Sequence, residues 1–151
     1  MSGKKIVYFD HENEMLNPLP PFMSGDAGLV WLDESGTARS DSRVQISPNS
    51  LHALHGHGVV GELNGLDFMF SEVGHGTDAV VAPAAVEAAT RIFYEADRMT
   101  YGATHDLHIR DHEGVEYRLV VDNREYQRTL SQLQFLASSA AQRGLSLRIR
   151  I

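Results

Sequence analysis

The strictest hydrophobic pattern in the chain lies at its C-terminal end, and it constrains the fold more than any other feature. Residues 145–151 alternate between apolar and polar side chains, with Leu145, Leu147, Ile149 and Ile151 on one side. Because successive side chains of a strand point to opposite faces, this alternation predicts a strand with one buried face. We expect this strand to pair inside or beside a sheet.

Two longer helices are predicted upstream of this strand. The first begins at Pro83, runs to about Tyr101 and is closed by Gly102. The second is capped by Asp122 and runs to about Arg143. An Asp followed three residues later by a Glu has the form of a capping box. Apolar residues recur at helical spacing in both segments, so each helix should bury one side.

Shorter strands complete the second half of the chain. Residues 78–82 form a short apolar run, and residues 106–110 and 115–121 alternate around a turn. Residues 77–151 thus follow the ferredoxin-like order strand, helix, strand, strand, helix, strand. If the first short strand is absent, the pattern becomes two hairpin–helix units and a closing strand. Both alternatives predict an α+β fold, a mostly antiparallel sheet with the two longer helices on one face.

The N-terminal half is expected to consist mainly of β-hairpins. Residues 5–10 and 29–32 have the apolar, β-branched character of strands, and residues 38–46 return from a turn as another strand. Residues 11–26 are polar and then Pro-rich, which predicts a surface loop. No Ser- or Gly-rich linker separates the two halves, so we treat residues 1–151 as one domain.

A tripeptide, Gly-His-Gly, occurs twice in this half, centred on His57 and on His75. Between the two copies, Asn64 and Gly65 favour a two-residue type I′ turn, because both positions of that turn take a positive φ. A hairpin that turns there places His57 opposite Glu72, with His75 just beyond. Two imidazoles and a carboxylate are therefore predicted to meet at the open end of the hairpin.

Further histidines lie close upstream. Ser47 followed by Pro48 predicts the start of a short helix that ends at Gly56, and His52 and His55 share a face of it. Imidazole and carboxylate are ligands of zinc. The candidate metal ligands are His52, His55, His57, Glu72 and His75. No recognised metal-binding spacing such as H-E-x-x-H is present, so we expect solvated turn histidines and no obligatory cofactor, with zinc as the alternative.

A second group of histidines and acids lies on the predicted hairpin of the C-terminal half. His105, His108 and His112 accompany Asp106 and Asp111. His108 and Asp106 share the face opposite the apolar residues of their strand. We expect this face to be exposed and to need no functional explanation.

Charge is distributed unevenly along the chain. Residues 1–76 carry ten acidic and four basic side chains, a net charge of −6, whereas residues 77–151 carry ten acidic and nine basic ones, a net charge of −1. Binding to phosphates depends on clustered Lys and Arg, which argues against nucleic acid as a direct ligand. The acidic half favours a cationic protein partner or a metal ion, or it keeps the protein soluble.

Composition restricts the compartment and the chemistry. Cysteine is absent, which excludes disulfides, thiolate metal sites and cysteine nucleophiles. The apolar run at residues 6–9 is too short for a signal sequence or a membrane span, so we expect a cytoplasmic protein with no membrane partner. Neither a G-x-S-x-G motif nor a P-loop is present, and the balance of these features leans against an enzyme.

These features favour a small acidic binding module that occludes a protein partner, such as an immunity- or antitoxin-type inhibitor of a bacterial toxin. The alternative is a metal-dependent enzyme or small-ligand-binding protein that uses the histidine cluster. A self-associating subunit is a third possibility. The predicted partner-binding residues are Asp10, Glu12, Glu14, Phe22, Asp26, Trp31, Asp33, Glu34 and Asp41.

Overall fold

The computed structural model of the chain describes residues 5–8, 27–66, 69–70 and 79–151. Along the chain, the elements are β1 (Lys5–Tyr8), β2 (Gly28–Leu32), β3 (Ala38–Gln45), α1 (Pro48–Gly56), α2 (Val59–Asn64), β4 (Met69–Phe70), β5 (Ala79–Val81), α3 (Pro83–Met99), β6 (Thr104–His112), β7 (Val115–Asp122), α4 (Asn123–Gln142) and β8 (Leu147–Arg150). The strand pairs are antiparallel except for that of β1 with β7. The predicted α+β class is confirmed.

The last strand, β8, lies at the centre of a five-stranded sheet with the order β3-β2-β8-β5-β4. It pairs with β2 on one side and with β5 on the other, so that Leu147 lies opposite both Trp31 and Val81. Leu147, Ile149 and Ile151 are buried. The prediction of a paired, half-buried last strand is therefore confirmed.

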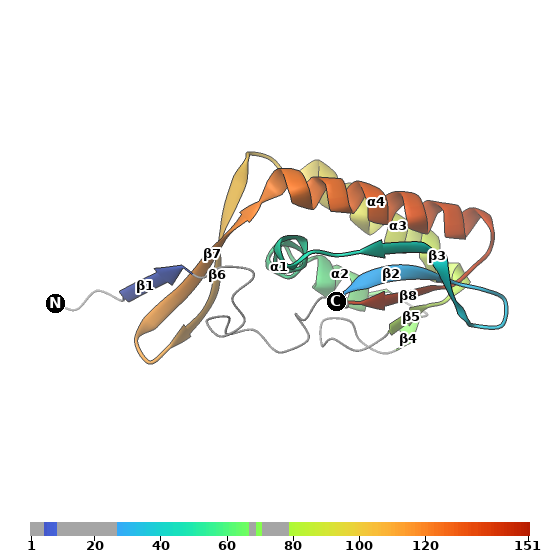
Figure 1. Cartoon of the computed structure of the whole chain (residues 1–151), viewed down its shortest axis with the longest axis horizontal. Coiled ribbons are helices and arrows are strands. Elements are labelled where there is room, and N and C mark those ends of the chain that lie inside the picture. The colour runs from blue at the N-terminus through green and yellow to red at the C-terminus, as the bar shows by residue number, and fades with distance from the viewer. Residues whose placement is uncertain (1–4, 9–26, 67–68, 71–78) are drawn as a thin grey trace.

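The two longer helices, α3 and α4, pack against each other along one side of this sheet (Figure 1). Asp122 caps α4 as predicted, because its side chain accepts hydrogen bonds from the backbone N–H groups of Arg124 at 2.9 Å and Glu125 at 3.3 Å. Ser47 caps α1 by accepting from the backbone N–H of Ser50 at 3.3 Å, and its hydroxyl donates to Glu125 at 2.5 Å. The two caps thus join the starts of α1 and α4.

The hairpin of β6 and β7 belongs to a second sheet, with the order β1-β7-β6. This hairpin extends away from the five-stranded sheet (Figure 1). A ferredoxin-like sheet would need β5 to pair with a strand of the hairpin, but β8 and β4 occupy the two edges of β5. Over residues 79–151 the predicted order of elements is confirmed, whereas the single ferredoxin-like sheet is wrong.

The predicted hairpin around Asn64 and Gly65 is also wrong. Residues 59–64 form α2, and Gly65 has a φ of −82° where a type I′ turn requires a positive value. Val59 and Leu63 are both buried, and they share a face in a helix as well as in a strand, so the apolar pattern does not distinguish the two. The register that set residue 57 opposite residue 72 is lost with the hairpin.

Candidate ligand-binding site at the Gly-His-Gly corner

The first Gly-His-Gly tripeptide forms the corner between α1 and α2. Gly58 has a φ of +82°, a value that glycine adopts at little cost, and it is the N-cap of α2. A Cβ on Gly56 would lie 2.5 Å from both Cδ atoms of Leu107, so any other residue there would require the Leu107 side chain to shift. The two glycines therefore fix the place of His57 between the helices and the second sheet.

His57 lies between two other rings. Its imidazole stacks on the phenol ring of Tyr126 in α4, with 5.1 Å between the ring centroids and 9° between the planes. On β6, the ring of His105 lies 4.6 Å away at an angle of 51°. Three segments that are far apart in the sequence thus contribute one aromatic cluster.

Asn123, the first residue of α4, holds the neighbouring turn between α3 and β6. Its side-chain NH₂ donates to the carbonyl oxygens of Tyr101 at 3.0 Å and Gly102 at 3.4 Å, and its backbone N–H donates to that of Ala103 at 3.0 Å. Gln127, one turn further along α4, donates to the carbonyl of Thr100 at 2.9 Å. With its NH₂ group engaged in this way, the side chain of Asn123 retains only Oδ1 as an acceptor.

Three polar atoms in this cluster are buried without a hydrogen bond of good geometry among the described residues: His57 Nε2, Asn123 Oδ1 and Tyr126 Oη. Asn123 and Tyr126 are 1% and 0% exposed. A buried polar group without a partner costs roughly 1–3 kcal/mol of stability. Such groups are found at functional sites, where binding or catalysis is retained at a cost in stability.

A cavity of about 490 Å³ opens in front of His57. Its lining includes His57, His105, Glu62, Glu95, Met99 and Tyr101. Neither of the two carboxylates forms an ion pair with a residue that the structure describes. The volume lies within the range of about 300–1,000 Å³ that is typical of sites for small molecules. We refer to this hollow as the corner cavity.

The electrostatics of the cluster favour neutral rings. Burial lowers the pKa of His57, the charge of the nearby His105 lowers it further, and hydrogen bonding with the side chain of Asn123 raises it. Burial raises the pKa of Tyr126 well above its usual value, and the charges of Asp97 and Glu62 add to this effect. His57 is therefore a neutral imidazole and Tyr126 a protonated phenol at neutral pH.

A pH dependence of stability follows from the lowered pKa of His57. As the pH falls below about 6.5, His57 takes up a proton in the unfolded chain but not in the folded protein. Proton uptake by the unfolded chain alone favours unfolding. The stability that the neutral His57 confers is therefore complete above about pH 6.5 and is lost as the pH falls towards the pKa of His57 in the folded protein. We expect the loss between pH 7.5 and pH 5 to be smaller in His57→Gln, as measured by urea denaturation. Equal losses in the variant and the wild type would contradict this assignment.

The other predicted metal ligands that the structure describes, His52 and His55, do not join this cluster. His52 is buried, and its Nδ1 lies 2.8 Å from the carbonyl oxygen of Pro48 within α1. His55 is half-buried, and Glu72 and His75 lie outside the described residues. Within the described part of the chain, His52, His55 and His57 do not bring their ligand atoms together as a metal-binding group.

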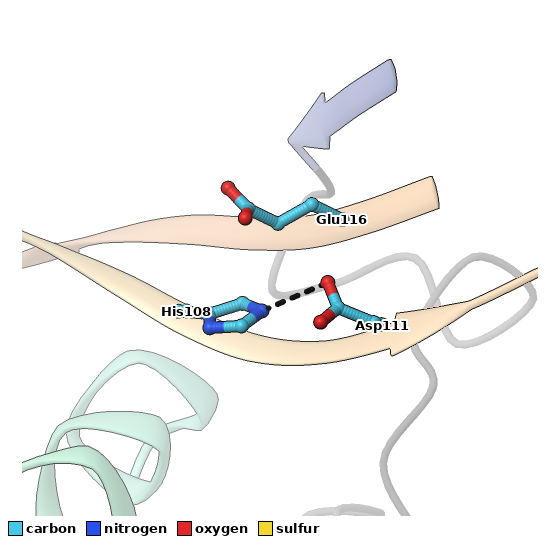
Figure 2. Close-up of side chains that lie close together, drawn as sticks. All are labelled: His108, Asp111 and Glu116. Carbon is cyan, nitrogen blue, oxygen red and sulfur yellow. Dashed lines mark hydrogen bonds and ion pairs between the residues drawn. The ribbon is translucent and has the colours of Figure 1, made fainter. Parts of the chain in front are cut away.

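The described residues that do bring three ligand atoms within 4.8 Å are His108, Asp111 and Glu116, on β6 and β7 (Figure 2). His108 Nε2 lies 3.1 Å from Asp111 Oδ1, and Arg118 donates to Glu116 at 3.1 Å and to Asp106 at 2.8 Å. His108 and Asp106 are exposed, as expected for this strand face, and Asp111 is exposed as well. A surface network of ion pairs accounts for the cluster, because its ligand atoms already have protein partners.

The predicted partner-binding residues fall into two groups. Asp10, Glu12, Glu14, Phe22 and Asp26 lie outside the described residues. Trp31 is buried, donates from its indole N–H to the carbonyl of Leu136 at 2.8 Å, and contacts the guanidinium groups of Arg39 and Arg143 with its ring. Its indole is therefore not available at the centre of an exposed patch.

Of the three acidic members of the second group, Asp33 and Glu34 lie between β2 and β3, and Asp41 lies on β3. Asp33 accepts hydrogen bonds from Ser35 and Thr37, and these bonds hold the pKa of its carboxyl below the usual value. Glu34 is exposed. Asp41 lies 3.5 Å from the guanidinium of Arg39. The structure thus gives Asp33 a turn-stabilising role, while the role of these residues in partner binding stays a prediction.

Sequence reasoning missed most of the residues around the corner cavity. Tyr126 was expected only as part of the apolar stripe of its helix, and Asn123 only as part of the capping segment. Glu62 and Glu95 had no distinguishing pattern. Among the cavity residues, His57 carried a local signal, its two flanking glycines, and His105 was named only as a member of the second group of histidines.

Comparisons of the chain with known protein families, curated proteins and solved structures find no match. Within the described residues, none of the helices combines the length and the apolar character that crossing a membrane requires.

Proposed function

We propose that the protein binds a small organic molecule in the corner cavity. The observation that carries this proposal is the convergence of His57, His105, Glu62 and Glu95 on one hollow of about 490 Å³. These side chains come from the corner, β6, α2 and α3, and each contributes hydrogen-bonding capacity to the same space. Sites for small molecules combine such a hollow with a few convergent polar groups.

The buried polar atoms behind His57 support the proposal. His57 lines the cavity and stacks on Tyr126, and the orphaned atoms of Tyr126 and Asn123 lie in the same cluster. A ligand that forms a hydrogen bond with His57, or displaces its ring, changes the hydrogen-bonding environment of Tyr126 and Asn123. The unsatisfied atoms then have a function in the bound state that they lack in the free protein.

A matched pair of substitutions on α3 tests the proposal. Ala96 lines the cavity and Ala84 is exposed on the same helix outside it. We expect fragments from a chemically mixed library to shift the ¹H–¹⁵N NMR signals of residues around His57, and we expect Ala96→Trp to abolish these shifts while Ala84→Trp retains them. Circular dichroism checks that both variants fold. If no fragment shifts these signals in the wild type, or if the shifts persist in folded Ala96→Trp, the proposal fails.

A second candidate function is the occlusion of a cationic protein partner in the cytoplasm, as an immunity- or antitoxin-type inhibitor would provide. The observation that favours it is the net charge of −6 carried by residues 1–76. Negative charge concentrated in one part of a protein speeds its encounter with a basic active site.

This candidate predicts a strong dependence of association on salt. The association rate with a cationic protein partner should fall about tenfold or more when salt is added, because the Debye length shrinks from about 10 Å at 0.1 M to about 3 Å at 1 M. Charge reversal at the exposed Glu34 should slow association, whereas reversal at Glu87 on α3 serves as the control. Stopped-flow fluorescence measures the rate, and a rate indifferent to salt and to Glu34→Lys would exclude electrostatic steering.

A further inference from the structure

The charged groups of the corner cavity carry information about its ligand. We infer that the cavity binds an organic cation, a primary ammonium or guanidinium group attached to a small apolar body. This inference rests on the proposed function and specifies the class of ligand.

The two carboxylates provide the first argument. Glu62 on α2 and Glu95 on α3 both line the cavity, and the described lining contains no Lys or Arg. Neither carboxylate has an ion-pair partner among the residues that the structure describes. The two helices contact each other, so both negative charges act on the same space. An anionic ligand would have to approach them without a compensating guanidinium or ammonium group.

The end of α3 adds to the negative potential. Ala96, Met99 and Thr100 form the C-terminal turn and cap of this 17-residue helix, and all three line the cavity. The C-terminal end of a helix carries the negative pole of its dipole and favours a nearby cation.

The carboxylates and the ring of His57 offer hydrogen-bond acceptors to the cavity. An ionised carboxylate only accepts, so neither Glu62 nor Glu95 can donate to a ligand. The neutral ring of His57 offers one acceptor nitrogen. An ammonium with three donors or a guanidinium with five is complementary to such a set.

The rim of the cavity provides an apolar contact for the remainder of the ligand. Met99 is 75% exposed and Tyr101 is 88% exposed, and both line the cavity. The face of a tyrosine ring also attracts a cation. The ligand therefore combines a cationic head with an apolar body of modest size.

Three probes of similar size and different charge test this inference. Isothermal titration calorimetry compares benzylamine, benzyl alcohol and benzoate, which at pH 7.5 are a cation, a neutral molecule and an anion. We expect benzylamine to bind about tenfold or more tightly than benzoate, because hydrogen bonds to charged groups are the strong ones. Glu62→Gln or Glu95→Gln should weaken the binding of benzylamine about tenfold and leave that of benzyl alcohol unchanged.

Glu87→Gln is the control, because Glu87 is exposed on α3 outside the cavity. This variant should bind benzylamine as the wild type does. Benzoate binding as tightly as benzylamine, or benzylamine binding that is unaffected by both cavity substitutions, would overturn the inference of a cation but leave the proposed function intact. If only neutral or anionic fragments shift the NMR signals around His57, the inference of a cation is likewise overturned and the proposed function is retained. The absence of any cavity-binding fragment would overturn the proposed function itself.

Discussion

Leu147→Asp should lower the free energy of unfolding by about 4 kcal/mol or more. Leu147 is 0% exposed and lies in the central strand of the five-stranded sheet, opposite Trp31 and Val81. The substitution removes the apolar contacts of a buried leucine and transfers a carboxylate from water into the interior of the protein. Urea denaturation followed by circular dichroism measures the change.

A conservative variant separates the effect of charge from that of shape. Leu147→Met keeps the volume and apolar character of the side chain and should cost less than about 1.5 kcal/mol. Gln142→Asp, at an exposed position at the end of α4, should cost less than about 1 kcal/mol, because the new carboxylate meets only the negative pole of the helix. Wild-type stability in Leu147→Asp would mean that β8 does not occupy the centre of the sheet.

The position of β8 illustrates what the sequence could predict. Strict alternation at Leu147, Ile149 and Ile151 identifies a half-buried strand, because only a period of two places all three on one face. The capping pattern at Asp122 likewise identifies the start of α4, because the capping hydrogen bonds are local. Signals that depend on neighbouring residues were therefore sufficient for the class of fold and for both long helices.

The features of the fold that depend on contacts between distant residues could not be predicted from the sequence. The hairpin of β6 and β7 could pair with β5 only if the edge of β5 opposite β8 were free. In the structure, the two-residue strand β4 pairs with this edge. The segment Val59–Leu63 fits a helix and a strand equally well by its apolar spacing. The cluster around His57 depends on Tyr126 and Asn123 meeting this histidine across about 70 residues of sequence, and no local pattern indicates that contact.

Tyr126→Phe should raise the free energy of unfolding of the ligand-free protein by about 1–2 kcal/mol. Most substitutions of a fully buried residue destabilise a protein, so the expected direction is itself a strong test. The hydroxyl of Tyr126 is buried without a hydrogen-bond partner among the described residues, whereas its ring stacks on His57. Phenylalanine retains the ring and removes the cost of desolvating the hydroxyl.

Tyr94→Phe is the matched control, because Tyr94 is 41% exposed on α3 and its hydroxyl can be hydrated in the folded protein. That variant should change stability by less than about 0.5 kcal/mol. Urea denaturation of the wild type and both variants gives the three values. A clear loss of stability in Tyr126→Phe would show that the hydroxyl has a partner in the free protein, such as an ordered water. A gain accompanied by weaker binding of benzylamine would identify Tyr126 as a residue that costs stability because the corner cavity requires its hydroxyl.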